Sequence, residues 1–403
     1  MKKDKGYKQT KIGLIPEDWE IKQLGEISNI SSGGTPSRGV SSYWNGNIPW
    51  VTTSQIDFNI INQANEFITE EGLKNSAAKI CKAGTLLMAM YGQGKTRGKV
   101  ALLGFDATTN QACAIISLEN KIFNEYIFYN LSGRYEEIRN LSNTGNQENL
   151  NSNIIKSIPI PLPPLPQQKK IAVILSTWDE AIEKLESLVA LKEKRKKGLM
   201  QSLLTGKKRL KGFNANWIEY YLGDLFNERI EIGFNNLPLV SVTRDRGIIF
   251  RNLEDQKDTS SEDKSKYLHI CPGDIGYNTM RMWQGVSGLS EIEGIVSPAY
   301  TILKPQKNVH GLFFQYLFKF PSMINYFYRH SQGLVSDTLN LKYSNFRKIK
   351  AFIPPLPEQK HIAEVLSTAD NEMNLHKEEI EKIKLQKKGL MQKLLTGQVR
   401  VNG

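Results

Sequence analysis

The sequence predicts an α+β protein: two pseudo-symmetric, mixed α/β domains joined by two long antiparallel coiled-coil helices. Three observations support this prediction. Residues 163–206 and 354–397 repeat one another without a gap, at a constant offset of 191 positions (Gly198 to Gly389). Within both copies the apolar residues recur with a 3.5-residue period. Weaker similarities flank both copies, so the duplication extends over the whole chain.

Each copy of the repeat predicts one long helix. Pro166 and Pro357 stand in the expected first turn, where the missing amide donor costs nothing. Gly206 and Gly397 stand at the expected end, where a left-handed cap favours glycine. A helix of about 39 residues would be roughly 58 Å long.

Apolar residues step by four and three along both predicted helices, which is the spacing of a coiled-coil seam. Lys192, Lys196, His376 and Lys387 interrupt the seam, and we expect them to fix its register. Since the copies match in length, antiparallel pairing of one with the other is expected. Separate packing of each helix on its own domain is the alternative, and it would make the matched lengths accidental. The expected helix-pair interface contains Ile171, Leu175, Trp178, Ile182, Leu185, Ile362, Leu366, Met373, Ile380 and Ile383.

The flanking similarities divide the rest of the chain. Residues 19–27 resemble 217–226, residues 81–100 resemble 271–288, and residues 149–168 resemble 340–359, whereas the middles of the two halves differ. The carboxyl-terminal LLTGQVRVNG would continue naturally into the amino-terminal GYKQTKIGL. The predicted divisions are a first domain (1–162), a first helix (163–206), a second domain (207–353) and a second helix with a tail (354–403).

Short apolar runs bounded by glycine or polar residues predict strands at 84–91, 99–105 and 112–118. Helical patterns are predicted at 69–77, 124–141, 310–320 and 322–330. Each half is therefore expected to be one mixed domain followed by one long helix.

Composition favours a polyanionic partner. The chain has 403 residues and a net charge of +12, with a pI near 9.3. A ribosomal or membrane-surface partner would also fit this charge. Three cysteines (Cys81, Cys113, Cys271) form no CxxC pair, and the five histidines lack metal-ligand spacing, so no metal site is expected. No signal peptide or long apolar run is present in the sequence, and a cytoplasmic, non-membrane protein is expected.

One glycine-rich basic loop is the first candidate DNA contact. Residues 89–96 fit a relaxed phosphate-binding loop, but a strand follows where such a loop needs a helix. We therefore expect a β-hairpin with a basic tip, which either contacts DNA or is simply solvated. Arg97 is the expected base reader, and Lys95 and Lys99 the expected phosphate contacts. The candidate contacts here are Tyr91, Gln93, Lys95, Thr96, Arg97 and Lys99.

Other loops combine donors and arginines that suit base or phosphate contacts, although each could be an ordinary loop. The segment 31–38 contributes Ser32, Gly34, Thr35 and Arg38 as candidates. The second half contributes Arg244, Arg246, Asn278, Arg281 and Gln284. The basic runs at 192–197 and 207–211 are either solvated faces or neighbours of phosphates. No catalytic triad, paired acid site or cofactor fingerprint is found in the sequence, which favours a binding protein over an enzyme.

The doubled PPLP[QE]QK…KKGLMQ[SK]LLTG signature, together with WEIKQLGEI, the SSGGTPSR loop and IPWV, resembles the specificity subunits of type I restriction–modification systems. This resemblance covers essentially the whole chain. It implies two target recognition domains, each reading one half of a split DNA sequence, and paired helices that set the gap between the halves. Because recognition domains diverge widely in this family, the resemblance assigns no base-contacting residue.

The resemblance also implies a non-catalytic subunit and its partners. Two methyltransferase subunits carrying S-adenosylmethionine and two restriction subunits using ATP and Mg²⁺ would join this chain, which itself binds no cofactor. Two alternatives remain at this stage. One is an orphan specificity subunit that serves only a methyltransferase, and the other is a coiled-coil scaffold with no role in DNA binding.

Overall fold

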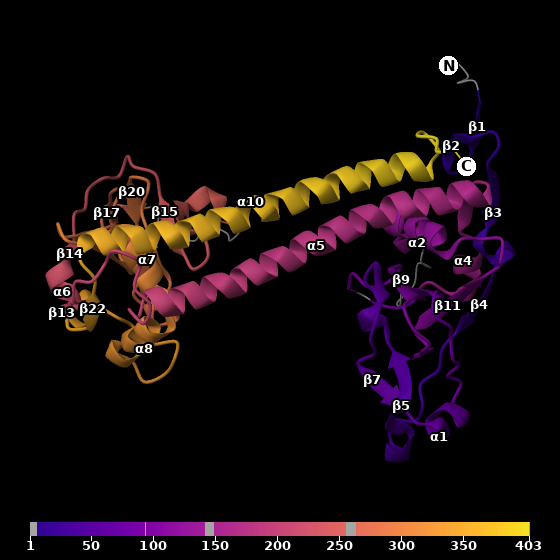
Figure 1. The fold of residues 1–403 in the computed structure, drawn as a ribbon, viewed down its shortest axis with the longest axis horizontal. Coiled ribbons are helices and arrows are strands. Elements are labelled where there is room, and N and C mark those ends of the chain that lie inside the picture. The colour runs from indigo at the N-terminus through magenta and orange to yellow at the C-terminus, as the bar shows by residue number, and fades with distance from the viewer. Residues whose placement is uncertain (1–5, 93, 142–148, 255–262, 403) are drawn as a thin grey trace. The chain divides into compact units, whose positions relative to one another are not determined.

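The computed structural model describes residues 6–92, 94–141, 149–254 and 263–402. The chain divides into two compact units (Figure 1). The first unit holds residues up to Leu185 together with those from Glu379 onward, and the second holds Glu186–Glu378.

A five-stranded sheet forms the centre of the first unit. Its strands lie in the order β4-β11-β8-β9-β6, with β6 parallel to β9 and the other pairs antiparallel. These strands are β4 (Ser28–Ser32), β11 (Cys113–Leu118), β8 (Leu86–Ala89), β9 (Val100–Leu103) and β6 (Asn59–Ile61). The strands predicted at 84–91, 99–105 and 112–118 are thereby confirmed.

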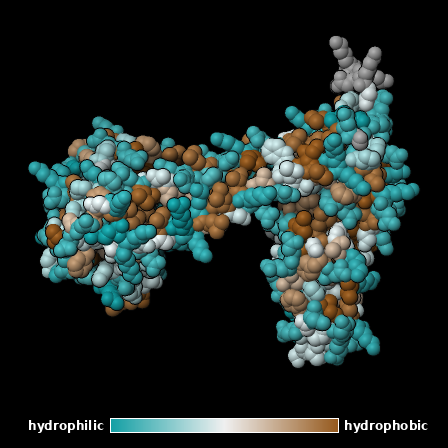
Figure 2. All heavy atoms as spheres, in the orientation of Figure 1, coloured by the Kyte–Doolittle hydropathy of each residue, from teal (hydrophilic) through white to brown (hydrophobic). Residues whose placement is uncertain are grey.

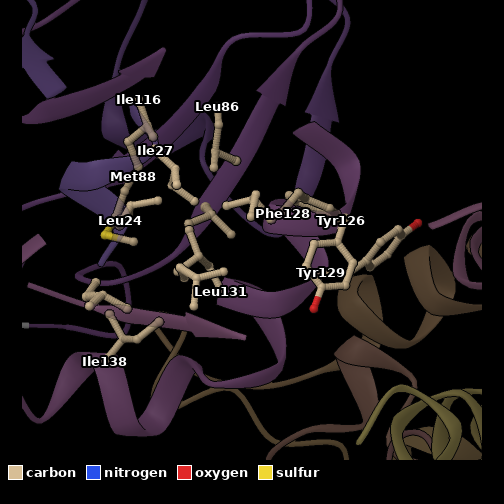
Figure 3. Packing of buried hydrophobic residues seen from close by; sticks show 14 of the residues in the cluster. Leu24, Ile27, Leu86, Met88, Ile116, Tyr126, Phe128, Tyr129, Leu131 and Ile138 are labelled. Carbon is tan, nitrogen blue, oxygen red and sulfur yellow. The ribbon is translucent and has the colours of Figure 1, made fainter. Parts of the chain in front are cut away.

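Strands β8 and β9 are buried on both faces, because alternate side chains enter different cores. Leu86 and Met88 join the larger core, whereas Leu87 and Ala89 join a smaller one on the other side. Helices α2 (Asn124–Gly133) and α3 (Tyr135–Arg139) cover the larger core, which Figure 3 shows around Leu131 and Ile138. A predicted helix at 124–141 is therefore confirmed, with a break at Arg134.

Smaller elements complete the first unit. A three-stranded sheet has the order β10-β5-β7, and the pairs β1-β2 and β3-β12 are antiparallel. Their bounds are β1 (Tyr7–Thr10), β2 (Gly13–Pro16), β3 (Glu20–Gln23), β5 (Trp44–Val51), β7 (Glu66–Ile68), β10 (Thr108–Thr109) and β12 (Pro159–Leu162). Short helices are η1 (Leu24–Glu26), η2 (Ser41–Tyr43), η3 (Thr53–Gln55), α1 (Glu70–Lys74) and α4 (Ser152–Lys156).

The second unit is built on a four-stranded antiparallel sheet in the order β14-β21-β18-β19. Three antiparallel pairs, β13-β22, β15-β16 and β17-β20, surround it. The strands are β13 (Ile218–Tyr221), β14 (Phe226–Arg229), β15 (Val240–Thr243), β16 (Gly247–Phe250), β17 (Leu268–Ile270), β18 (Ile275–Asn278), β19 (Ser287–Leu289), β20 (Gly294–Val296), β21 (Tyr300–Pro305) and β22 (Lys350–Ile353). The helices are α6 (Leu222–Leu225), η4 (Arg251–Leu253), η5 (Met282–Gln284), α7 (Gly311–Phe318), α8 (Pro321–His330) and α9 (Tyr343–Phe346).

Sheet topology bears out the duplication. The order β4-β11-β8-β9 in the first unit corresponds to β14-β21-β18-β19 in the second. The pairs β3-β12 and β13-β22 also correspond: in both units the strand before the long helix pairs with the strand that precedes a short helix, η1 or α6. What differs lies between these elements, as the unlike middles of the two sequence halves predicted.

The two predicted long helices are α5 (Leu165–Leu203) and α10 (Leu356–Leu395). Each belongs partly to one unit and partly to the other. Each is followed by a glycine with positive φ, 67° at Gly206 and 71° at Gly397, which is the cap that the sequence predicted.

Within each unit the two helices run antiparallel. In the second unit Lys192 pairs with Glu372 at 2.7 Å and Lys196 with Asp370 at 2.5 Å. The partner residue number on α10 therefore decreases as the residue number on α5 increases, which is the pattern of antiparallel helices. In the first unit Lys387 pairs with Asp179. Of the expected interface residues, Ile171, Leu175, Ile182, Ile362, Leu366, Met373 and Ile380 are buried, and Trp178, Leu185 and Ile383 are half-buried.

The same three-residue contact fixes the helix pair to each domain. The Tyr129 hydroxyl donates to Asp179 at 2.7 Å, and Lys387 lies over the Tyr129 ring while pairing with that carboxylate. In the second unit Tyr316 donates to Asp370 at 2.7 Å, and Lys196 occupies the place of Lys387. Burial, followed by the hydrogen bond to the carboxylate, raises the pKa of both phenols, so they remain protonated donors. The polar interruptions of the seam therefore set its register.

The chain ends meet in the first unit. Arg400 forms a bidentate pair with Asp18 at 2.7 Å, and the Tyr7 hydroxyl donates to the Gly397 carbonyl at 2.8 Å. This contact holds the carboxyl-terminal tail beside the amino-terminal strands, as the sequence predicted. Arg400 in turn holds the pKa of the Asp18 carboxyl below its usual range, mainly through this hydrogen bond.

Replacing Leu175 with alanine should unfold the first unit more easily. Its side chain is fully buried among residues of α2 and the end of α10, so Leu175→Ala removes apolar contacts and leaves a cavity. A loss of about 2–5 kcal/mol in the free energy of unfolding is expected. The matched control is Leu385→Ala on α10, where the leucine is 71% exposed and the change should be within about 0.5 kcal/mol. Chemical denaturation of both variants measures the difference, and equal losses would contradict the assigned packing.

Candidate nucleic-acid interface

The loop between β8 and β9 was expected to be a projecting basic tip. In the structure it is a turn held down by α3. The Tyr135 hydroxyl donates to the Lys95 carbonyl at 2.6 Å, and the Arg139 guanidinium donates to the Gly94 carbonyl at 2.5 Å. These contacts give the loop a fixed backbone. Gln93 lies outside the described residues.

Arg97, the expected base reader, is only 3% exposed, so its guanidinium is not presented at the surface of this structure, and base reading by Arg97 stays a prediction. The reason is its position between the turn and α3, where Arg139 also donates to the Arg97 carbonyl. The Lys99 side chain is also largely covered: it is 20% exposed, and its ammonium group pairs with Asp57 at 2.5 Å. Of the candidate residues of this loop that the structure describes, Tyr91 and Lys95 are exposed and Thr96 is half-buried.

An open hollow of about 520 Å³ joins the two candidate loops of the first unit. Ser31–Gly33 line one side, and Met90 and Tyr91 line the other. Lys79 and Asn151 also line it, and neither was singled out from the sequence because nothing in their local spacing marks them. The structure therefore brings together the predicted Ser32 and Tyr91, and it adds a cation and an amide beside them.

The glycines of the 31–38 loop serve the fold rather than a ligand. Gly34 is buried, and a Cβ atom there would lie 2.3 Å from the backbone between Ala77 and Ala78. The absence of a side chain at Gly34 is therefore explained by close packing of the chain on itself, and its contact with DNA stays a prediction. Thr35 is half-buried and its hydroxyl donates to Gln111.

Arg38 lies on the surface with its guanidinium already oriented. It lies 3.7 Å from the centre of the Trp44 ring and pairs with Glu66. Because the arginine side chain is still 55% exposed, the ion pair is worth little and is easily exchanged for a phosphate or a base. Stacking on tryptophan keeps the planar group extended, which suits a bidentate contact.

The second unit places its candidate residues on two neighbouring loops. Arg244 and Arg246 stand on the tight turn of the β15-β16 hairpin, both exposed. Asn278 ends β18, and Arg281 and Gln284 lie in the connection from β18 to β19. Arg281 is exposed and the other two are half-buried. Strand β19 packs against both β15 and β16, so these loops belong to one face of the unit. Contact with DNA remains a prediction for all of these residues.

Two substitutions in the β8-β9 loop should affect different properties, one DNA binding and the other stability. Lys95→Ala removes an exposed cation, so DNA binding of the assembled complex should weaken alike for all sequences and lose about one unit of salt dependence. Arg97→Ala removes a buried polar side chain, so the free energy of unfolding should fall by about 1–3 kcal/mol. Salt titrations of binding and denaturation curves measure the two effects. Loss of discrimination at one base position in Arg97→Ala, with unchanged stability, would contradict the assigned burial.

The fold and these loops define a class of protein: a duplicated binding module in which each α+β unit holds the start of one long helix and presents basic loops. The chain belongs to the family of the type I restriction modification DNA specificity domain, whose family model matches residues 16–193 and 291–385. No helix among the described residues combines the length and apolar character needed to cross a membrane.

Individual relatives agree with this assignment. The type I restriction enzyme MjaIX specificity subunit of Methanocaldococcus jannaschii is 31% identical over 182 residues, 44% of this chain and 41% of that protein. Thus the aligned segment spans less than half of that relative. The putative type I restriction enzyme MjaX specificity subunit of the same organism is 27% identical across 99% of this chain and 98% of its own length.

A solved structure shares the fold. The type I restriction-modification system S subunit from M. genitalium superposes with a TM-score of 0.57 at 16% sequence identity, covering 93% of this chain and 96% of that one. At this identity the similarity concerns the fold alone.

Proposed function

We propose that this chain is the DNA-sequence specificity subunit of a type I restriction–modification complex. Each recognition domain, 1–162 and 207–353, reads one half of a split target, and the paired helices 163–206 and 354–397 set the gap between the halves. The observation that carries the proposal is the duplication: the two units share their sheet order and helix attachment, yet differ between these shared elements. Two domains that share a scaffold but differ in their central segments suit a DNA target with two unlike halves.

Charge and loop placement support DNA as the ligand. A net charge of +12 favours a polyanion, and Arg38, Lys79 and Lys95 in the first unit and Arg244 and Arg281 in the second stand on or beside the candidate loops. Arginine and asparagine side chains have the geometry for bidentate contacts to base edges.

The partners follow from the family. Two methyltransferase subunits carrying S-adenosylmethionine and two restriction subunits using ATP and Mg²⁺ would assemble with this non-catalytic chain. Apolar side chains remain exposed on both helices, since Leu191 and Leu375 are each 65% exposed. Figure 2 shows hydrophobic atoms among the hydrophilic ones where the long helices of Figure 1 run. Such side chains suit a surface that partner subunits cover.

Reconstitution tests the proposal. The purified chain alone should neither methylate nor cleave DNA, whereas its addition to the methyltransferase subunit should produce sequence-specific methylation. The measurement is S-adenosylmethionine turnover on a genomic DNA substrate, with the chain, the methyltransferase and the mixture assayed in parallel. Sequence-specific methylation by the methyltransferase subunit alone, or turnover by this chain alone, would contradict the assignment.

A further inference from the structure

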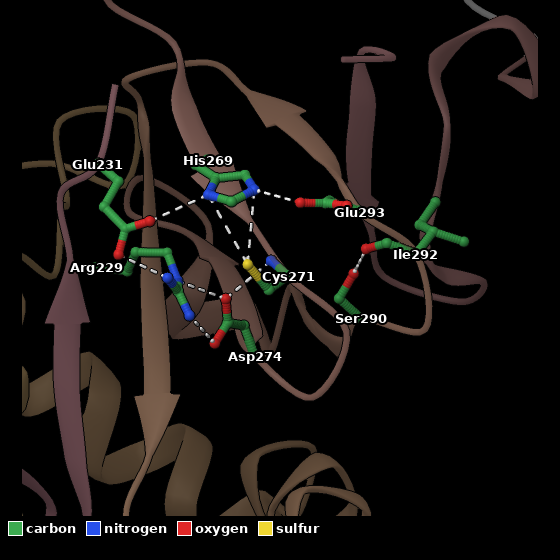
Figure 4. Close-up of polar contacts among 8 residues, drawn as sticks. All are labelled: Arg229, Glu231, His269, Cys271, Asp274, Ser290, Ile292 and Glu293. Carbon is green, nitrogen blue, oxygen red and sulfur yellow. Dashed lines mark hydrogen bonds and ion pairs between the residues drawn. The ribbon is translucent and has the colours of Figure 1, made fainter. Parts of the chain in front are cut away.

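Four side chains with metal-binding atoms converge at one edge of the second unit (Figure 4). His269 comes from β17, Cys271 follows that strand, and Glu293 precedes β20, which pairs with β17. Their ligand atoms lie within 4.8 Å of one another. Glu231 completes the group from the segment after β14, and its backbone carbonyl accepts a bond from the His269 amide.

The distances approach those of a tetrahedral zinc site. The Cys271 sulfur lies 3.6 Å from Nε2 of His269, and a Glu293 carboxylate oxygen lies 2.9 Å from the same nitrogen. Ligands at about 2.0–2.3 Å from Zn²⁺ in tetrahedral geometry are roughly 3.3–3.8 Å apart. The sulfur also lies 3.8 Å from Nδ1, so the ion would require rotation of the Cys271 side chain toward Nε2 as well as a wider separation of His269 and Glu293.

The surroundings of His269 fix which nitrogen faces the ligands. Nδ1 of His269 faces Glu231 at 3.1 Å and Nε2 faces Glu293 at 2.9 Å. A metal bound at Nε2 would replace the second of these contacts, with Glu231 retaining the proton on Nδ1. The Phe234 ring stacks on the imidazole with a centroid separation of 4.0 Å and an interplanar angle of 17°. These two contacts orient a side chain that is only 7% exposed.

The balance of charge also favours a cation. Three carboxylates, Glu231, Asp274 and Glu293, surround the cluster, and Arg229 pairs with the first two of them. The Glu293 carboxylate contacts His269, and its side chain is 54% exposed. A divalent ion would offset this excess, and a mixed nitrogen, sulfur and oxygen ligand set is one that Zn²⁺ accepts.

We propose that His269, Cys271 and Glu293 bind a Zn²⁺ ion, with Glu231 as the residue that orients His269. The ion would leave one coordination position to water and would tie the β17-β20 pair to the turn before β18. Because β18 leads directly into the Asn278–Gln284 loop, the ion would stiffen the base of that loop. The sequence did not predict this cluster because strand pairing, rather than close spacing, brings Glu293 to His269.

The test is a zinc titration of tag-free, metal-stripped full-length protein against a chromogenic chelator. One ion per chain is expected, and Co²⁺ should give a thiolate-to-metal charge-transfer band. Cys271→Ser and His269→Gln should each weaken binding by about 100-fold or more and abolish the band, whereas Glu231→Gln should weaken it by about 10–100-fold. Matched controls are Cys113→Ser, a buried thiol of the first unit, and Glu291→Gln, an exposed carboxylate two residues from Glu293.

A second measurement avoids reliance on variants that could fail to fold. In the wild-type protein, Zn²⁺ should slow alkylation of Cys271 at least about tenfold, read by mass spectrometry of the peptide that contains it, because a coordinated thiolate is shielded. The buried thiols of Cys81 and Cys113 serve as internal references. Absence of stoichiometric binding, binding that survives Cys271→Ser, or unchanged alkylation would each overturn the proposal.

Discussion

Exchanging residues 28–150 for the corresponding segment of another specificity subunit is expected to change one half of the recognised sequence completely and leave the other half intact. The exchange replaces the central sheet, the candidate loops and α2 with Tyr129, and it keeps β3 and β12 on either side of the exchanged segment. Trp19, whose indole donates to Gln167 at 3.1 Å, and the Arg400–Asp18 pair stay in place. The donor segment must also supply a tyrosine in the place of Tyr129, as Tyr316 does in the second unit, so that the contact with Asp179 is kept while the reading surface changes.

The readout for the exchange is the methylated motif, determined by methylome sequencing of cells that carry the hybrid gene. The reciprocal exchange, residues 230–340, is the matched control and should alter the opposite half. A hybrid that changes both halves together would show that the two units do not read DNA independently. An unchanged motif would show that the exchanged segment does not read it.

Lengthening both long helices by one heptad is expected to widen the gap between the two half-sites by about three base pairs while both half-sites are retained. Seven helical residues add roughly 10.5 Å, and successive base pairs are about 3.4 Å apart along the DNA axis. One heptad also returns the seam to nearly the same face, with a drift of only about 20°. The insertion thus changes length without replacing the contacts that hold the pair.

The ion pairs show where the two insertions must be placed. Asp179 faces Lys387 in the first unit and Lys196 faces Asp370 in the second, so insertion after Leu185 in α5 matches insertion after Ile380 in α10. Binding selection from a duplex pool with varied gaps measures the preferred spacing. An insertion in α5 alone is the control: it shifts the register of one helix only, separates these pairs, and should lower stability. An unchanged preferred gap in the double insertion would count against the helices as the spacer.

Features that depend on local pattern could be predicted from the sequence. The gapless repeat, its Pro166 and Pro357 starts and its Gly206 and Gly397 ends predicted the two helices, because periodicity and capping are properties of neighbouring residues. Antiparallel pairing followed from matched lengths. The topology of the sheets could not be derived, although the strands that form β8, β9 and β11 could.

The missed features all depend on long-range contacts. Arg97 is buried because α3, about forty residues later in the chain, packs on its loop. No pattern in the neighbouring residues predicts that contact. The role of Tyr129 and Tyr316 was missed for a similar reason. They lie outside the repeat and reach it only when α2 and α7 dock, so the repeat showed Asp179 and Asp370 but not their donors.

The central claim is that this chain determines a split DNA target in which two half-sites are separated by a fixed gap. Methylome sequencing of the host with and without the gene tests it most directly, since the methylated sites record what the assembled complex recognises. We expect one motif of two unlike half-sites with an unspecified gap of constant length, present with the gene and lost without it. A continuous motif, or a motif that persists after deletion of the gene, would contradict the claim.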